Sequence, residues 1–130
     1  MIDAVSISDN QVELVQDKGL LINCNELTPL PSLSSLRRLH GNSEEVVSYY
    51  KRTTAGLRIL KTALRLIDDA KPRFVAFHSE EGLYRSPAMA DLVAQELCEL
   101  GYRVLLSHYR LPVPAEELIP TRRSWGEYNS

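Results

Sequence analysis

The sequence predicts an α/β fold: a three-layer-like single domain with a small, mostly parallel sheet and flanking helices. Between residues 73 and 108, an apolar run, a helical pattern and a second apolar run follow one another. A strand–helix–strand unit of that length is a right-handed parallel crossover. With 130 residues, 44% of them hydrophobic, the chain can bury one core. We expect one domain over residues 1–111 and an irregular tail over 112–130.

The N-terminal part predicts two strands. QVELV (11–15) alternates apolar and polar residues, DKG offers a turn, and GLLINC (19–24) is a short apolar run. The two strands are candidates for a hairpin. A connection with prolines and serines then runs from residue 25 to 41, and connections this long inside compact domains are often functional.

Residues 43–69 predict one long helix. Asn42 or Ser43 can cap it, two glutamates follow in the first turn, and apolar residues recur every three or four positions. Pro72 disfavours helix at the residue before it. The basic residues on the other faces could form a nucleic-acid patch, although a solvated helix face is the simpler account.

The second half predicts a strand, a helix and another strand. RFVAF (73–77) is the first strand, and YRVLLSH (102–108) is the second. We expect Ser86 to be the N-cap of the helix, with Pro87 as its first residue and Gly101 just past its end. In the tail we expect a helical turn near Ala115 and packing of Trp125 onto the body or a neighbouring subunit.

Charge and cysteine usage exclude several classes of protein. The formal net charge of −2 does not favour non-specific binding to a polyanion. Cys24 and Cys98 lie far apart without a CxxC or Cys/His cluster, so we expect buried, reduced thiols and no metal site. The sequence contains neither a membrane-spanning stretch nor a signal-peptide pattern. We therefore expect a soluble, cytoplasmic protein.

The loop HSEEGLYRSP (78–87) has the features of an anion site. It joins a strand end to a helix N-terminus, where unpaired N–H groups attract negative charge, and Arg85 suits a phosphate or carboxylate. His78 and His108 end two strands that should lie side by side or one strand apart, so both should face one crevice. Glu80 and Glu81 oppose an anion. They could instead bind a ligand's hydroxyl or amino groups, or pair with Arg85 in the empty site.

The loop is similar to the Cys-five-Arg-Ser loop of cysteine-dependent phosphatases, with Ser79, five residues, then Arg85 and Ser86. Those enzymes attack phosphorus with a thiolate. A serine hydroxyl is a far weaker nucleophile unless a base activates it. We therefore do not expect phosphatase activity.

Four stretches resemble, in order, the C-terminal domain of the RapZ family of RNase adapter proteins. They are LLINCNEL, LRRLHGNSEEVVSYY, FVAFHSEEGLYRS and VLLSHYRL, within residues 12–111. The resemblance implies a divergent, stand-alone relative of a domain that binds a phosphosugar, glucosamine-6-phosphate, and small RNA.

The resemblance is partial at the level of single positions. The shared residues are Gly41, Gly82, Arg85, Ser86 and His108. The family's characteristic residues are replaced by Asn23, Asn25, Ser79, Glu80, Glu81, Tyr84, Ser107 and Tyr109. These changes remove basic groups and add two acidic ones, so the resemblance implies the same fold and site location but a different ligand.

We interpret the chain as a regulatory or adapter module that binds a phosphorylated metabolite or nucleotide and acts by self-association or through a protein partner. We expect no cofactor and assign no catalytic residue. One alternative is a small enzyme acting on such a compound in the same crevice, and a weaker one is an RNA-binding adapter. The expected ligand-binding residues are His78, Ser79, Glu80, Glu81, Gly82, Leu83, Tyr84, Arg85, Ser86, His108, Asn23 and Asn25.

Overall fold

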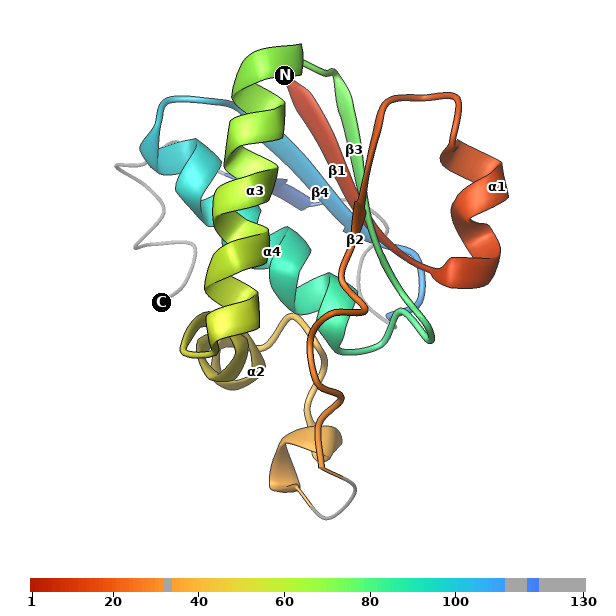
Figure 1. The fold of residues 1–130 in the computed structure, drawn as a ribbon, viewed down its shortest axis with the longest axis vertical. Coiled ribbons are helices and arrows are strands. Elements are labelled where there is room, and N and C mark those ends of the chain that lie inside the picture. Colours follow the sequence, from red (N-terminus) through yellow and green to blue (C-terminus); the bar gives the residue numbers. More distant parts are fainter. Residues whose placement is uncertain (32–33, 112–116, 120–130) are drawn as a thin grey trace.

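The computed structural model describes residues 1–31 and 34–111 and the backbone of 117–119 (Figure 1). Its sheet has the strand order β2-β3-β1-β4-β5. The strands β1 to β4 are parallel to their neighbours, and β5 runs antiparallel to β4. The predicted α/β class with a mostly parallel sheet is confirmed. The strands are β1 (Ile2–Ser8), β2 (Leu20–Asn23), β3 (Phe74–Ser79), β4 (Val104–His108) and β5 (Glu117–Ile119).

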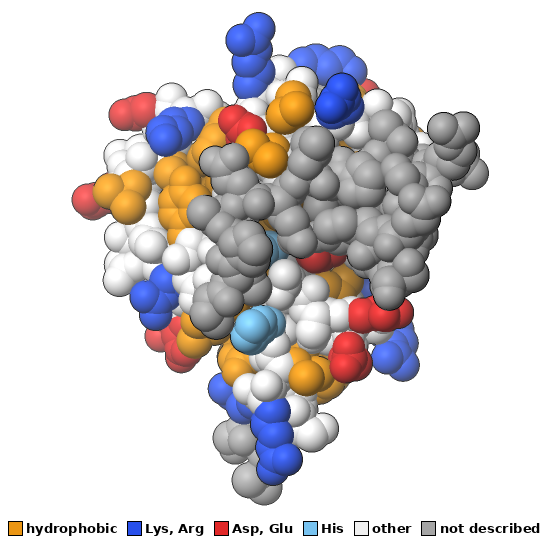
Figure 2. Space-filling view, turned by 180° about the vertical axis from the view of Figure 1, so that it is seen from behind, with side chains coloured by type: hydrophobic (Ala, Val, Ile, Leu, Met, Phe, Trp, Pro, Cys, Tyr) orange, Lys and Arg blue, Asp and Glu red, His pale blue; other side chains and the backbone are white. Residues whose placement is uncertain are grey.

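Helices lie on both faces of the sheet (Figure 1). One face is covered by α3 and α4, with α2 packed against these two helices, and the other face carries the short helix α1. The helical elements are η1 (Asp9–Gln11), α1 (Val12–Val15), η2 (Ser35–Arg38), α2 (Glu44–Lys51), α3 (Thr54–Ala70) and α4 (Arg85–Glu99). Figure 2 shows the molecule from behind. In the described part of this view, Lys and Arg side chains lie around the margin and form no continuous basic surface.

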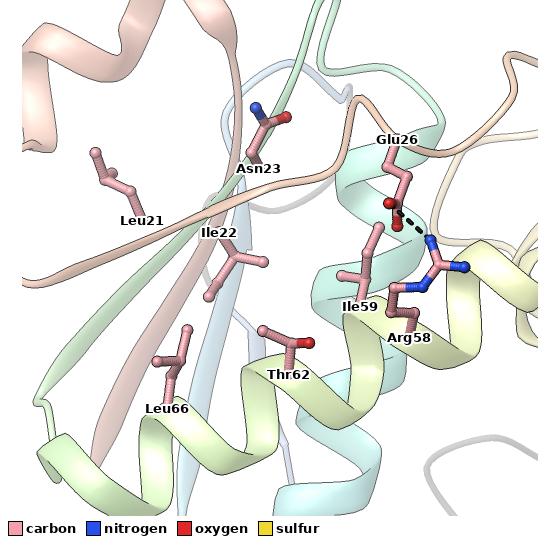
Figure 3. A pocket seen from close by; sticks show the side chains of 8 residues that line it. All are labelled: Leu21, Ile22, Asn23, Glu26, Arg58, Ile59, Thr62 and Leu66. Carbon is pink, nitrogen blue, oxygen red and sulfur yellow. Dashed lines mark ion pairs between the residues drawn. The ribbon is translucent and has the colours of Figure 1, made fainter.

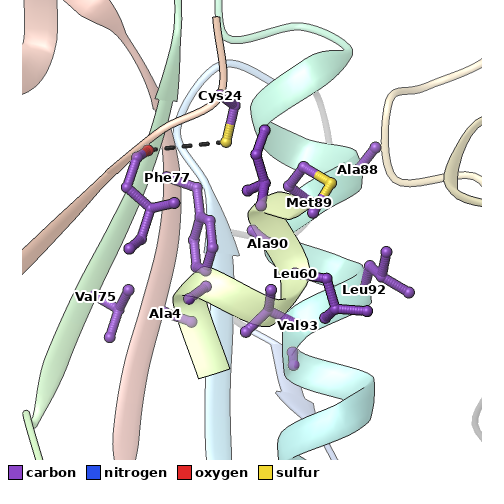
Figure 4. Packing of buried hydrophobic residues seen from close by; sticks show 14 of the residues in the cluster. Ala4, Cys24, Leu60, Val75, Phe77, Ala88, Met89, Ala90, Leu92 and Val93 are labelled. Atoms are coloured by element: carbon purple, nitrogen blue, oxygen red, sulfur yellow. Dashed lines mark hydrogen bonds between the residues drawn. The ribbon is translucent and has the colours of Figure 1, made fainter. Parts of the chain in front are cut away.

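The main core lies between the sheet and α4. Val75 and Phe77 point from β3 toward Met89 and Val93 of α4, and all four side chains are buried (Figure 4). A smaller cluster lies on the opposite face, where α1 covers its share of the sheet. It consists of Val5, Ile7, Val15 and Ala76. Alternate residues of β1 and β3 therefore face different helix layers, as the period of two in a strand requires.

The prediction for the N-terminal part of the chain was wrong. Residues 2–8 form the central strand β1, which sequence reasoning did not identify, and QVELV lies in η1 and α1. The chain turns after β1 because Ser8 and Gln11 close a capping box, in which the Ser8 N–H donates to Gln11 Oε1 at 2.9 Å. The expected hairpin is also absent from the described residues, since β2 pairs in parallel with β3.

The predicted long helix is two helices, α2 and α3, separated at Arg52 and Thr53. The Thr53 hydroxyl donates to the Tyr50 carbonyl at 2.7 Å and accepts the Gly56 N–H at 2.9 Å, so Thr53 caps α3. A Cβ at Gly56 would lie 2.0 Å from the Tyr50 carbonyl oxygen, which shows how tightly the chain turns. The spacing of apolar residues did not reveal the break, because both helices bury residues every three or four positions.

Several smaller expectations are confirmed. Gly101 follows α4 with a φ of +96°, the left-handed position expected past a helix end. Cys24 and Cys98 are buried, and neither forms a disulfide within the described residues. Among the described helices, none has the length and apolar character needed to cross a bilayer. The expectations for Ala115 and Trp125 lie outside the described residues, and within the tail the backbone of residues 117–119 forms β5.

Candidate functional site

The carboxyl ends of β1 and β3 form a topological switch point. The two strands are neighbours, with Ser8 opposite Ser79, yet β1 continues to α1 on one face and β3 to α4 on the other. The chains thus diverge at this edge, and open α/β sheets bind ligands in the crevice that such divergence creates. The predicted loop starts from this point.

The predicted histidines lie one strand apart, because β1 separates β3 from β4. This satisfies the expected spacing, but the two side chains face opposite sides of the sheet. His108 follows Leu106 of the α4-side core by two residues, whereas His78 follows Ala76 of the α1-side cluster by two residues. The structure therefore does not bring the two histidines into one site.

Helix α4 begins at Arg85, one residue before the expected N-cap, so Ser86 and Pro87 lie inside its first turn. Ser79 provides the cap instead: its hydroxyl oxygen accepts the Ser86 N–H at 3.2 Å and donates to the Ser86 hydroxyl at 2.9 Å. Ser86 in turn donates to the Ile7 carbonyl at 3.0 Å. Pro87 is tolerated there because first-turn N–H groups need no helical partner. Ser79 is thus a buried cap, not an activated nucleophile.

Two glycines set the position of the loop. Gly82 has a φ of +72°, and a Cβ there would lie 2.7 Å from the Ser8 nitrogen. The loop consequently lies directly on the end of β1. A Cβ at Gly41 would lie 2.2 Å from the Leu83 carbonyl oxygen, so the long connection before α2 packs against the loop from the other side.

A small pocket of about 40 Å³ lies between the loop and this connection. Its lining includes two arginines, Arg37 from η2 and Arg85 from α4. Of the predicted residues, the pocket is lined by Ser79, Glu81, Gly82, Leu83, Tyr84 and Arg85. Among the described residues, no acceptor is found for the backbone N–H groups of residues 81–85.

Arg37 was missed by sequence reasoning. Its guanidinium donates to the Leu30 carbonyl at 2.6 Å and lies 5.7 Å from the centre of the Tyr84 ring, while the Tyr84 hydroxyl donates to the Arg37 carbonyl at 2.5 Å. The pair of arginines in a long connection was a signal, but no sequence pattern relates residue 37 to residue 84. Only the folding of the connection onto the loop brings them together.

Arg85 is the most buried charge of the pocket, with 12% of its side chain exposed. It donates to the Leu27 carbonyl at 3.3 Å, and its Nη2 lies 4.0 Å from a carboxylate oxygen of Glu80. The Glu80 side chain is 81% exposed, so this ion pair is long and solvent-screened and contributes little. The expected pairing of a loop glutamate with Arg85 is therefore present but weak.

Arg85 also affects neighbouring buried groups. Burial raises the pKa of Tyr50 to about 12, and the positive charge of Arg85 partly opposes that rise. Burial likewise raises the pKa of the Cys24 thiol, again against the charge of Arg85. The field of Arg85 therefore extends into the protein interior beside the pocket, where it disfavours further positive charge and favours negative charge.

The second group of predicted residues surrounds Asp9, on the α1 side of the loop. His78 Nδ1 lies 2.7 Å from Asp9 Oδ1, and the Asn25 amide nitrogen donates to both Asp9 oxygens at 3.0 and 3.2 Å. Asn25 Oδ1 accepts the Glu80 N–H at 2.9 Å, and Asn23 Oδ1 accepts the Asn25 N–H at 2.8 Å. Asp9 was missed because β1, which positions it, was not predicted.

His108 belongs to neither group. Its Nδ1 lies 2.6 Å from the Ser6 hydroxyl oxygen, and its Nε2 is buried without a hydrogen-bond partner in the described part of the chain. His108 is only 4% exposed, and burial lowers its pKa to about 4. His108 also does not line the pocket beside Arg85.

A larger cavity of about 390 Å³ lies between β2 and α3 (Figure 3). Its walls are mainly apolar, with Ile22, Ile59 and Leu66 directed toward the space, and Asn23 is its only predicted site residue. At its rim Arg58 and Glu26 form an ion pair of 2.7 Å. Because its charged groups neutralise each other, this cavity lacks the charge to select an anion.

Comparison with known proteins gives no relative: no protein-family model and no curated protein matches this sequence. The resemblance to the RapZ C-terminal domain therefore stays a prediction, and the case for a function depends on the site itself.

Proposed function

We propose that this protein is a binding module for a small anion-bearing ligand, a phosphorylated metabolite or nucleotide, whose phosphate occupies the pocket beside Arg85. The observation that carries the proposal is the convergence of Arg37 and Arg85 on one small pocket at the N-terminus of α4. A guanidinium can donate two parallel hydrogen bonds to one phosphate, and a helix N-terminus adds its dipole.

The backbone of the loop supports the same ligand class. The N–H groups of residues 81–85 lack acceptors among the described residues, and consecutive free N–H groups form anion-binding concavities. A volume of about 40 Å³ suits a single phosphate group rather than a whole metabolite. The remainder of the ligand would then lie outside the pocket, beside the exposed Glu80, whereas Glu81 lines the pocket itself.

The capping role of Ser79 favours a binder over a phosphatase-like enzyme. Its hydroxyl is engaged with both the N–H and the hydroxyl of Ser86, and neither group is a base that could activate it. We further propose that ligand binding changes the self-association of the protein or its binding to a protein partner. Sedimentation with and without phosphate tests the first of these.

Thermal denaturation tests the proposal. Inorganic phosphate, sugar phosphates and nucleotides are compared with chloride at equal ionic strength. A ligand present at about 100 times its Kd stabilises the protein by about 2.7 kcal/mol and raises Tm by on the order of 10 °C. We expect Arg85→Ala to abolish this shift and Arg37→Ala to reduce it.

Arg58→Ala is the matched control, because Arg58 is an arginine that lines the cavity between β2 and α3 and not the pocket beside Arg85. It should leave the shift unchanged. The proposal fails if none of the phosphate compounds stabilises the wild-type protein, or if Arg85→Ala and Arg58→Ala retain equal shifts.

A further inference from the structure

We propose that His78 and Asp9 form an acid–base pair at the switch point, in which His78 Nε2 exchanges a proton with a hydroxyl group of the bound ligand or of water. This inference makes the protein an enzyme rather than a binder alone. It rests on the proposed function for the anchoring of the ligand, but the pair itself is defined by contacts outside the pocket beside Arg85.

The carboxylate of Asp9 determines which imidazole nitrogen is basic. A carboxylate can only accept, so the 2.7 Å contact requires the hydrogen of the neutral ring to be on Nδ1. The lone pair is then on Nε2. Two hydrogen bonds from Asn25 hold Asp9 in this orientation, which makes Asp9 a positioning residue for His78.

His78 is held firmly yet remains accessible. Its side chain is 15% exposed, and Nε2 is not among the buried polar atoms that lack a partner in the described residues. Each of the other two histidines lacks one of these properties. His108 is held by Ser6 but buried, and His40 is exposed but makes no side-chain hydrogen bond with the described residues. Within the described residues, His78 alone combines a carboxylate partner with access from solvent.

A chain of contacts joins the pair to the proposed anion pocket. Asp9 contacts Asn25, Asn25 accepts the Glu80 N–H, and the Glu80 carboxylate lies 4.0 Å from Arg85. The two groups therefore flank the same short segment of loop. A ligand anchored by its phosphate near Arg85 can extend along this segment and place a hydroxyl group, or an attacking water, at His78.

The proton-transfer step is balanced by the residues present. As the oxygen attacks an electrophilic centre of the ligand, its O–H bond breaks and an Nε2–H bond forms, while the oxygen keeps the electron pair for the new bond. The imidazolium charge is balanced by Asp9. The bond between that centre and the leaving oxygen then breaks. The leaving oxygen takes the electron pair of this bond and accepts the proton from Nε2, which restores the neutral ring.

The three histidines allow the pair to be tested without any phosphate ligand. Diethyl pyrocarbonate acylates a histidine through an unprotonated ring nitrogen, and peptide mass spectrometry measures the rate at each site. At about pH 8, where free imidazole is neutral, we expect His78 to react faster than the exposed His40, and His108 to react slowest. Asp9→Asn should slow His78 by at least about tenfold, because the amide no longer fixes the tautomer.

Two further readouts separate positioning and catalysis from a structural role. Nitrogen NMR should find the His78 hydrogen on Nδ1 in the wild-type protein and lose that preference in Asp9→Asn. Hydrolysis of 4-nitrophenyl acetate should show a solvent deuterium isotope effect, and should fall at least about tenfold in His78→Asn but not in the matched variant His40→Asn.

The proposal is overturned if His78 reacts no faster than His40, if Asp9→Asn leaves its tautomer unchanged, or if His78→Asn and His40→Asn hydrolyse the ester equally. Separate measurements distinguish the two proposals. Phosphate stabilisation is measured on Arg85→Ala and the acylation rate of His78 on Asp9→Asn, so either proposal can fail alone.

Discussion

The hydroxyl of Ser79 caps helix α4 by accepting the backbone N–H of Ser86, seven residues further along the chain, at 3.2 Å. The cap therefore comes from the end of strand β3 rather than from the residue before the helix. This contact closes the loop between them and fixes the direction in which Arg85 leaves the first turn of the helix.

Ser79→Ala should destabilise the protein without affecting ligand binding. Loss of a cap costs about 1 kcal/mol, and the buried Ser86 hydroxyl also loses a partner. Urea denaturation measures the change in the free energy of unfolding. Ser43→Ala, which removes the cap of α2, is the matched control and should cost a similar amount. A loss of the phosphate-induced Tm shift in Ser79→Ala would instead indicate that Ser79 contacts the ligand.

Arg85→Lys should retain only part of the phosphate-induced Tm shift. The lysine keeps the positive charge but cannot donate two parallel hydrogen bonds to one phosphate. Its ammonium also cannot contact the Leu27 carbonyl in the same planar geometry. Calorimetric titration with phosphate should give a weaker affinity than wild type and a stronger one than Arg85→Ala. Equal phosphate affinities of Arg85→Lys and Arg85→Ala would show that a positive charge without the guanidinium geometry does not contribute to phosphate binding.

The stability of the protein should fall as the pH decreases from about 6.5 to about 4 because of His108. The folded pKa of about 4 lies below the usual 6.5, so the unfolded chain binds more protons in this window and protonation favours unfolding. The difference of about 2.5 pKa units corresponds to roughly 3 kcal/mol.

Urea denaturation across this pH range checks the effect. His108→Gln should reduce the dependence of the unfolding free energy on pH, whereas His40→Gln, at an exposed site, should retain it. The comparison is made between variants at each pH rather than between pH values. If His108→Gln loses stability with the same slope as the wild-type protein, the effect comes from other groups.

Gly82→Ala should be more damaging than Gly101→Ala. Both glycines have positive φ, so each substitution costs about 1 kcal/mol through backbone strain. At Gly101 a Cβ meets open space, but at Gly82 it would lie 2.7 Å from the Ser8 nitrogen. Gly82→Ala must therefore displace the loop and should also weaken phosphate stabilisation. Equal losses of Tm in the two variants would contradict the close approach of the loop to β1.

Sequence reasoning identified the loop but only part of the site. Gly82 and Arg85 were recognisable because a glycine and an arginine before a helix N-terminus are local signals. Arg37 was not, since it reaches the pocket only when the connection after β2 folds over the loop. Asp9 was missed for a related reason: its partner His78 is 69 residues away. The alternation that identifies a half-buried strand is absent from β1, which is buried at nearly every position.

The sequence by itself determined the α/β class, the crossover between β3 and β4 and the position of the loop, because periodicity and helix-end signals act over a few residues. The tertiary structure decided which residues meet. Strand order placed β1 between β3 and β4, and strand alternation then put His78 and His108 on opposite faces of the sheet. These relationships depend on pairings between residues distant in the chain, and local sequence patterns do not encode them.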